Sequence, residues 1–446
     1  MKLRTLACLS SVSGILAIAA CGSDDNAAPT PNPGQDASFD GSSGSSGASG
    51  SSGASGSSGS SSGADTGTSG GSSGIVDSGP DRADAGYTGP AHFLYAVGKA
   101  KDLLPDGAPA PVGVLGLTLD PTTGAIASFD TDAVTPGNQT YVLAGQEPTA
   151  GAATPNGKFL YVANANSASV SGYSVDTTNG GLTFVGTTSV VLGGGGGPTF
   201  LLTDSAGKRL YVSKQSGASI AIFDIGATGA LTSQTPPEVA VGQNSPRGMA
   251  LSLAGDFLFV ANNGADSVTT FNVDATSGTL TNPRKVSALG SPQAIIHHPT
   301  QKVIYVTAAN GQGVYAFQYD ATGALTEFPQ ADGGVQTVDN GPQGGVVDKA
   351  GKFLYVVNAT LPSYYITAFP LDTAGALIGT PVKTSLGTHG GGRGLVLDPD
   401  GKFLVLSGDV DLVATFAVGA GGTLTPTNNT IRGAAGSYFD PIIVAH

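Results

Sequence analysis

A few charged side chains stand at comparable places in the chain and are suited to act on one substrate. Arg247 and Arg393 each follow a Pro or Gly that opens an apolar stretch, and Glu147 directly precedes Pro148 at another such opening. Guanidinium groups bind carboxylates or phosphates and stabilise a developing oxyanion, whereas a carboxylate activates water. His389 lies shortly before Arg393 and is a further candidate acid or base. These four residues form the candidate catalytic set.

Each candidate also has a structural interpretation that the sequence leaves open. The arginines would pair with carboxylates in the wall of the site, Glu147 would be a solvated loop carboxylate, and the glycines beside His389 would only make a flexible loop. His297 and His298 are adjacent, so on a strand their side chains point in opposite directions and do not share one metal ion. We expect these two histidines to be structural or solvated.

The sequence predicts neither a cofactor nor a metal ion. The glycine run from Gly193 to Gly197 is not followed by the Lys-Ser/Thr pair and helix of a phosphate-binding loop. Asp409 and Asp411 alternate, which is too few carboxylates to predict a cation site. The Asp-Pro-Asp-Gly segment at 398–401 is typical of a tight turn.

The elements that must position the candidate residues recur about every fifty residues. Each unit has an apolar stretch usually opened by proline, a polar turn such as Pro155-Asn-Gly-Lys158, and a β-prone strand. A variable loop, a third strand, a second turn and a fourth strand follow. The β-prone strand has seven copies: Phe93–Val97, Phe159–Asn164, Arg209–Lys214, Phe257–Asn262, Val303–Ala308, Phe353–Asn358 and Phe403–Gly408.

Four antiparallel strands in each of seven units predict an all-β, seven-bladed β-propeller over residues 91–446. Tyr438 to His446 is expected to be an innermost strand that joins Phe93–Val97 and completes the first blade, so that the ring closes. The segment from Lys101 to Pro111 is expected to be a loop insertion. Because a closed ring leaves no long edge to pair, we expect a monomer.

The strand Phe159-Leu-Tyr-Val-Ala-Asn164, preceded by Pro-Asn-Gly-Lys, resembles the seven-bladed lactonase family over residues 91–446. That family includes 6-phosphogluconolactonase-like enzymes and, by fold, YVTN-type surface repeats. The resemblance implies a Gly-Pro-Arg-His type motif that places arginine and histidine in a central funnel. Arg247 and Arg393 match its arginine, but no blade has the histidine, and Gly248 and Gly394 stand in its place.

The first twenty residues are typical of a lipoprotein signal peptide. Residues 1–20 have a basic start and a short apolar run that ends Ile-Ala-Ala before Cys21, which is the expected lipidation site. The alternative is an ordinary secretory signal with an incidental Cys21. Residues 21–90 are rich in Gly, Ser and Ala and are expected to form a disordered linker. We therefore expect an exported protein held to the bacterial envelope by lipid, on the outer membrane or cell surface.

The chain is acidic, with a formal net charge of −13, and loss of the signal would also remove Lys2 and Arg4. This balance disfavours nucleic acid as a partner. Three functional hypotheses remain. A non-catalytic propeller that binds a small molecule, a glycan or an envelope protein is favoured. A lactone hydrolase and a passive envelope spacer are the alternatives.

Overall fold

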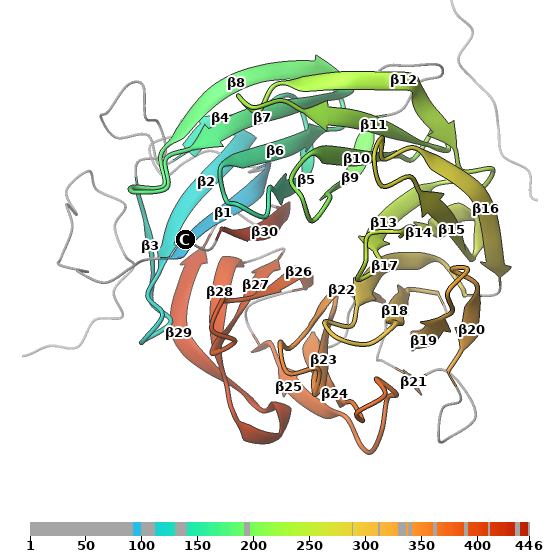
Figure 1. Cartoon of the computed structure of the whole chain (residues 1–446). Helices are drawn as coiled ribbons and strands as arrows, with labels where there is room; N and C mark the ends of the chain where they lie inside the picture. Colours follow the sequence, from blue (N-terminus) through green and yellow to red (C-terminus); the bar gives the residue numbers. More distant parts are fainter. Residues whose placement is uncertain are drawn as a thin grey trace, which may run out of the picture. The chain divides into compact units, whose positions relative to one another are not determined.

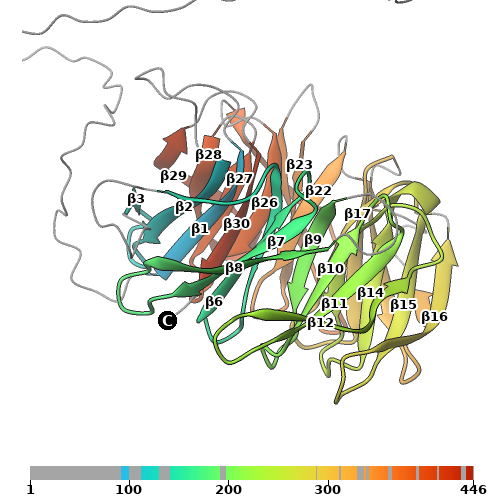
Figure 2. The same cartoon turned by 90° about the horizontal axis from the view of Figure 1, so that it is seen from above.

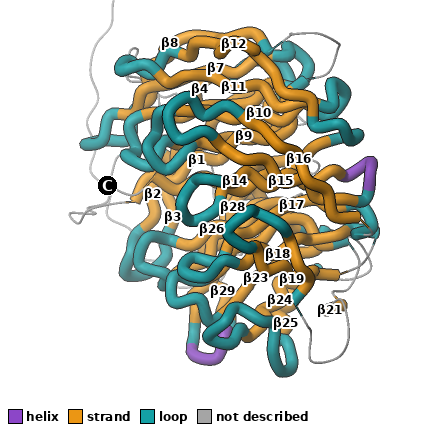
Figure 3. The backbone as a smooth tube through the Cα atoms, turned by 45° about the vertical axis from the view of Figure 1, so that its right-hand side comes forward, coloured by secondary structure: helices purple, strands orange, loops and turns teal. Residues whose placement is uncertain are grey.

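Short antiparallel strands joined by tight turns make up the described part of the chain. The computed structural model describes residues 92–99, 112–129, 141–190, 197–287, 289–310, 313–328, 336–337, 341–359, 364–387, 391–408, 411–432 and 438–444. The helices within these ranges are short 3-10 turns, such as η1 (Asn263–Ala265) and η3 (Ala420–Gly422) (Figure 3). A search of these ranges finds no helix with the length and apolar character that a membrane crossing requires.

Seven antiparallel sheets are arranged as blades around a central axis, which confirms the predicted fold class (Figure 1). Blade 1 comprises β30 (Tyr438–Val444), β1 (His92–Lys99), β2 (Val112–Leu119), β3 (Ile126–Ser128) and β4 (Tyr141–Leu143); blade 2 comprises β5 (Pro148–Ala153), β6 (Phe159–Asn164), β7 (Ser169–Val175) and β8 (Leu182–Ser189). Blade 3 comprises β9 (Pro198–Thr203), β10 (Arg209–Lys214), β11 (Ser219–Ile225) and β12 (Leu231–Ala240); blade 4 comprises β13 (Pro246–Leu251), β14 (Phe257–Asn262), β15 (Ser267–Val273) and β16 (Leu280–Ser287). Blade 5 comprises β17 (Pro292–His297), β18 (Val303–Ala308), β19 (Gly313–Tyr319), β20 (Leu325–Glu327) and β21 (Gln336–Thr337); blade 6 comprises β22 (Pro342–Val347), β23 (Phe353–Asn358), β24 (Tyr365–Pro370) and β25 (Val382–Ser385). Blade 7 comprises β26 (Gly392–Leu397), β27 (Phe403–Gly408), β28 (Asp411–Val418) and β29 (Leu424–Arg432).

The two ends of the described chain share blade 1, as predicted. Strand β30 pairs with β1 in antiparallel register, with Ala96 opposite Pro441 and Leu94 opposite Ile443. The ring thus has no gap between its first and last elements, and blade 7 lies beside blade 1 (Figure 1). The predicted loop insertion at 101–111 lies outside the described residues.

The second strand of each blade is buried, because each blade packs against another blade on both of its faces (Figure 2). In β6, Leu160, Tyr161, Val162 and Ala163 have no exposed surface. The turn before β6 is closed by Gly157, whose backbone N–H donates to the Thr154 carbonyl at 2.8 Å. Gly157 has a φ of 67°, which favours glycine. The turn residues seen in the sequence therefore fix where each buried strand begins.

A tyrosine hydroxyl joins most pairs of neighbouring blades. In β18, Tyr305 donates to the carbonyl of Gly375, which lies in a turn of the next blade, at 2.6 Å. The turn needs glycine, because Gly375 has a φ of 89° and a Cβ there would lie 3.2 Å from the hydroxyl. Equivalent bonds run from Tyr95 to Gly180, from Tyr161 to Gly229 and from Tyr211 to Gly278. At the closing seam, Thr415 of blade 7 donates to Gly124 of blade 1.

Candidate functional site

The beginnings of the innermost strands surround a central cavity of about 760 Å³, here called the funnel. Glu147, Arg247 and Arg393 all line it, and each side chain is partly buried. They come from the corner before β5 and from the second positions of β13 and β26. Three of the four candidate catalytic residues are therefore brought together by strands that lie far apart in the sequence.

Arg247 is held across the boundary between blades 4 and 5. Its Nη1 donates to Oε1 of Gln293, at the second position of β17. Burial and the nearby positive charge of Arg393 lower the pKa of Arg247. The structure thus shows a neutral amide as the partner of Arg247, whereas the structural interpretation expected a carboxylate. The guanidinium groups of Arg247 and Arg393 line the same cavity.

Glu147 occupies a strained corner that the propeller uses repeatedly. Its φ is 53°, and its carbonyl accepts a hydrogen bond from the Ala165 backbone at 2.8 Å. Ser245 and Ser291 precede the prolines of β13 and β17 with φ of 55° and 56°. The left-handed backbone is therefore a feature of the corner itself, and it sets the position from which the Glu147 side chain lines the funnel.

Polar residues that were not selected from the sequence also line the funnel. Thr149, Thr199, Gln293 and Gln343 occupy the same second position of their strands as the two arginines. Thr149 donates to the Pro198 carbonyl at 3.1 Å, which links blade 2 to blade 3. The signal that could have revealed these residues was their register in the repeat, since each directly follows the proline that opens the strand.

His389 lies outside the described residues, and so does the lipidation site Cys21. Gly248 and Gly394 line the funnel at the places where the family motif has histidine. None of the described residues that line the funnel is a histidine. Any acid or base from this part of the chain must therefore be Glu147, the one carboxylate among the described lining residues.

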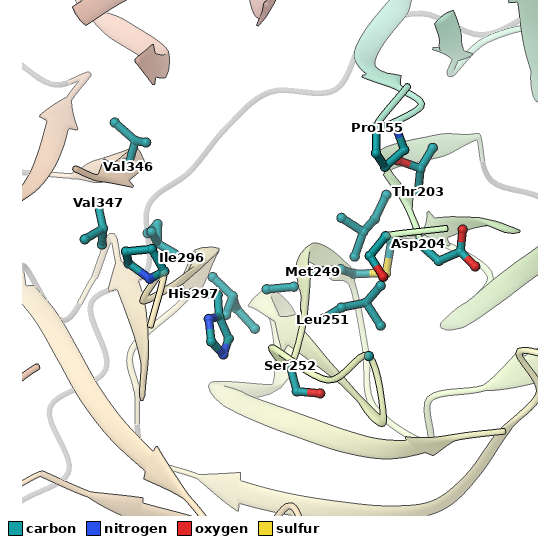
Figure 4. A pocket seen from close by; sticks show the side chains of 17 residues that line it. Pro155, Thr203, Asp204, Met249, Leu251, Ser252, Ile296, His297, Val346 and Val347 are labelled. Carbon is teal, nitrogen blue, oxygen red and sulfur yellow. The ribbon is translucent and has the colours of Figure 1, made fainter. Parts of the chain in front are cut away.

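A second cavity of about 460 Å³ lies near the far ends of the innermost strands. Figure 4 shows Val346 and Val347 on one side of it, Thr203 on the other, and Met249 and Leu251 between them. The lining is mostly apolar, and His297 is its one imidazole among the described residues. The two cavities thus differ in chemistry: two arginines and Glu147 line the funnel, whereas Asp204 is the one carboxylate among the described residues of this mostly apolar cavity.

The two adjacent histidines, which were expected to be structural or solvated, are both hydrogen-bonded to neighbouring groups of the propeller. Nδ1 of His297 donates to the His298 carbonyl at 2.5 Å, and Nε2 accepts from the Tyr319 hydroxyl at 2.8 Å. Burial lowers the pKa of His297 to about 4, although the hydrogen bond to the His298 carbonyl opposes this shift. Nδ1 of His298 accepts from the Gln301 backbone at 2.9 Å, so its Nε2 donates to Gly351 of the next blade.

Comparison with known proteins agrees with this architecture. The model of the family described as lactonase, seven-bladed β-propeller, matches residues 194–297 and 285–440, which together span more than half of the chain. The chain is 25% identical over 296 residues to a 6-phosphogluconolactonase of Pectobacterium carotovorum, covering 60% of this chain and 84% of that protein. It is 24% identical over 276 residues to one from Formosa agariphila, covering 57% of this chain and 76% of the relative.

Solved structures share the same fold. A Bacteroides fragilis protein that was provisionally assigned as a 6-phosphogluconolactonase superposes with a TM-score of 0.65 at 22% identity, covering 81% of this chain and 100% of the other. The periplasmic gluconolactonase of Pseudomonas aeruginosa superposes with a TM-score of 0.59 at 17% identity, covering 79% and 99%. Given the match to the family model, this chain belongs to the lactonase family of seven-bladed β-propellers.

Proposed function

We propose that the funnel binds and hydrolyses a sugar lactone that carries a negatively charged group. The observation that supports this most strongly is the placement of Arg247, Arg393 and Glu147 around one cavity. Although the chain as a whole is acidic, two guanidinium groups that line one cavity create a local positive field, and this field attracts an anion. The named relatives act on a lactone with a phosphate group, which is consistent with this substrate class.

In this proposal each residue has one task. The Glu147 carboxylate takes a proton from water, whose oxygen attacks the lactone carbonyl carbon. An arginine stabilises the oxyanion that forms, and the other binds the anionic substituent. When the carbonyl re-forms, the bond to the ring oxygen breaks. That oxygen takes up the proton from Glu147, so the products are an open-chain hydroxy acid and the regenerated carboxylate.

The second hypothesis is capture of the same anionic sugar without hydrolysis. It is favoured by Gly248 and Gly394, which stand where the family enzymes have histidine. Without an imidazole beside the arginines, the funnel keeps the groups that grip an anion but has only Glu147 to move a proton. Binding and turnover must therefore be measured separately.

The test uses the purified full chain with 6-phosphogluconolactone and with uncharged gluconolactone as substrates. Acid release reports hydrolysis, and calorimetry with 6-phosphogluconate reports binding. We expect faster turnover of the phosphorylated lactone. Glu147→Gln should lower kcat by about 100-fold or more. Arg247→Gln and Arg393→Gln should each lower kcat/KM by about 100-fold.

The matched control is Arg284→Gln. Arg284 lies on β16, away from the funnel, and its Nη2 donates to Asn272. This variant loses the same charge and should retain full activity. Binding of 6-phosphogluconate that needs both funnel arginines, without turnover, would establish the capture hypothesis. Neither binding nor turnover from folded protein would leave the passive spacer.

We further propose that the chain is a lipoprotein of the bacterial envelope. The support is the Ile-Ala-Ala-Cys21 motif and the polar residues that follow it. Cys21→Ser should abolish incorporation of labelled palmitate and move the protein from the membrane fraction to the soluble one. Palmitate labelling that persists in the variant would exclude Cys21 as the lipidation site.

A further inference from the structure

Three potential metal ligands meet where the ring closes. His92 is the first residue of β1 in blade 1, and Asp398 and Asp400 belong to the turn between β26 and β27 in blade 7. One imidazole nitrogen and one oxygen from each carboxylate all lie within 4.8 Å of one another. The two sides of this cluster come from the first and last parts of the ring, which no peptide bond joins at this seam.

The His92 ring supplies an independent sign that something is bound here. His92 is 9% exposed as a residue, and both of its ring nitrogens are buried without a hydrogen-bond partner. Buried imidazoles ordinarily satisfy at least one nitrogen, because an unmet polar group loses its hydration without compensation. A metal ion bound by one nitrogen would satisfy the ring from the side on which the two carboxylates lie.

Both sides of the cluster carry a potential metal ligand where most other blades have a different residue. The position equivalent to His92, directly before the residue that matches Phe93, is Lys158, Lys208, Lys302, Lys352 or Lys402 in five blades and Asp256 in blade 4. The third residue of the turn before that strand is Asn156, Ala206, Ala254, Thr300 or Ala350 elsewhere, but Asp400 in blade 7. A histidine and an extra carboxylate thus replace ordinary turn residues where the termini meet.

Backbone hydrogen bonds within the turn fix the orientation of the Asp398 carboxylate. Asp398 is 1% exposed as a residue, and its Oδ1 accepts the Phe403 backbone N–H at 2.7 Å. Its Oδ2 accepts from the Asp400 backbone at 3.3 Å. Such supporting bonds fix the orientation of ligands in metal sites. Pro399, between the two aspartates, stiffens the turn further.

One imidazole and two carboxylates match a divalent ion with mixed nitrogen and oxygen ligands. Zn²⁺ takes such ligands at about 2.0–2.2 Å, so its donors lie up to roughly 4 Å apart, and small side-chain rotations would close this cluster. Two carboxylates also neutralise the ion. Lys402 is the competing cation, with Nζ at 3.1 Å from Oδ2 of Asp400, but both side chains are about half exposed and free to separate. Lys349 also acts on the Asp400 carboxylate through its charge.

We propose that His92, Asp398 and Asp400 form a zinc site that fastens blade 1 to blade 7. This is a structural site, remote from the funnel residues and independent of the function proposed for them. The sequence predicted no metal, because its two parts are separated by some 300 residues and each part alone is an ordinary strand start or an ordinary turn.

The test is a calorimetric titration of ZnCl₂ into the full chain, produced without a histidine tag and stripped with EDTA. We expect one site at this seam and a rise of several degrees in Tm when Zn²⁺ is added. His92→Lys, which restores the residue of five other blades, and Asp400→Asn should each weaken binding by at least about tenfold. Both variants should also lose the Tm response.

Asp204→Asn is the matched control. Asp204 begins the corresponding turn of blade 3, where Oδ1 accepts the Lys208 and Arg209 backbone N–H groups. It should leave Zn²⁺ affinity unchanged. Circular dichroism verifies that each variant is folded. No Zn²⁺ binding by the wild type at up to about 1 mM would overturn the proposal. Undiminished binding in both seam variants, or a larger Tm response to Ca²⁺ than to Zn²⁺, would do the same.

Discussion

At the scale of the residue, a buried tyrosine hydroxyl adds a hydrogen bond to the packing between neighbouring blades. Tyr305 donates to Gly375, and three other second-strand tyrosines make the equivalent bond. Tyr355 occupies the same place in blade 6, yet its hydroxyl is buried without a partner. Burial raises the pKa of Tyr355 to about 12, so the group stays protonated under all ordinary conditions. Two tyrosines in the same position of the repeat therefore differ in whether the oxygen stabilises the fold.

Removing the hydroxyl should therefore change the free energy of unfolding differently at the two sites. Tyr305→Phe leaves the Gly375 carbonyl unmet and should lower the free energy of unfolding by about 1 kcal/mol. Tyr355→Phe removes a buried oxygen that has no partner, and should leave the free energy of unfolding unchanged or raise it slightly. Urea denaturation of both variants checks this. Equal losses in the two variants would mean that the bond to glycine contributes nothing.

His297 makes the stability of the propeller depend on pH. Its pKa is about 4 in the folded chain, because the ring is buried, and about 6.5 when exposed. Between these values the unfolded chain binds a proton that the folded chain does not, so stability falls as pH drops from about 6.5 to 4. Above pH 6.5 the group has no effect, and below pH 4 the loss is complete.

The variant His297→Gln should flatten this dependence, because glutamine does not titrate. Urea denaturation of wild type and variant at pH 7 and at pH 4.5 gives the comparison. We expect the wild type to lose more stability between the two values, by up to about 2–3 kcal/mol. Parallel losses in both proteins would assign the pH dependence to other groups, of which His298 is the nearest.

At the scale of the strand, the corner between the second and third strands is built differently in blades 3 and 4. In blade 4, the Asn262 amide donates to Ser267 and Thr269 at 3.3 and 2.8 Å. In blade 3, Lys214 takes the place of this asparagine and is fully buried. Its Nζ lies 2.5 Å from Oε1 of Glu238 on β12. A buried ion pair thus replaces a neutral hydrogen-bonded corner.

Breaking this pair on one side should be more damaging than removing it. Lys214→Met leaves Glu238 largely buried beside an apolar group, and should lower the free energy of unfolding by about 3–5 kcal/mol. The double variant Lys214→Met with Glu238→Leu removes both charges and should recover most of that loss. Chemical denaturation measures both. A double variant no more stable than the single one would show that the pair is not coupled in this way.

The repeat predicted what lies within a blade far better than what lies between blades. Strand order, turns and the pairing of Phe93–Val97 with the last strand follow from a pattern that is local in sequence. The same register placed Arg247 and Arg393 in the funnel. The Tyr305 bond to Gly375 and the Arg247 contact with Gln293 join residues some 50 to 70 positions apart, and side-chain geometry alone decides them. Lys214 looked like an ordinary strand end because its partner lies on another strand.

At the scale of the whole molecule, the ring depends on one strand pair. Every other blade consists of strands that follow one another in the chain, whereas blade 1 takes its innermost strand from the far end. Without β30, the edge of β1 would be open, and β26 and β5 would each lose a neighbour. The stability of all seven sheets is therefore linked through this blade.

A chain that ends at residue 436 should fail to form a monomeric ring. It lacks β30, so the exposed edge of β1 is free to pair with another molecule. We expect aggregation or dimers in size-exclusion chromatography with light scattering, and a loss of cooperative unfolding. Removal of residues 445–446 alone is the control, because the paired strand ends at Val444. A truncated chain that remains a stable monomer would show that the last strand is dispensable.

The pairing of β1 with β30 also sets an order of events during synthesis. About 340 residues separate the two strands, and a ribosome adds roughly 5–20 residues per second, so β1 waits for roughly 20–70 s before its partner exists. Blades 2 to 7 are contiguous and need no such delay. Ring closure therefore comes after the strands of blades 2 to 7 have been made. Until then the propeller is an open arc, and the edge of β1 that pairs with β30 is free to pair with another molecule.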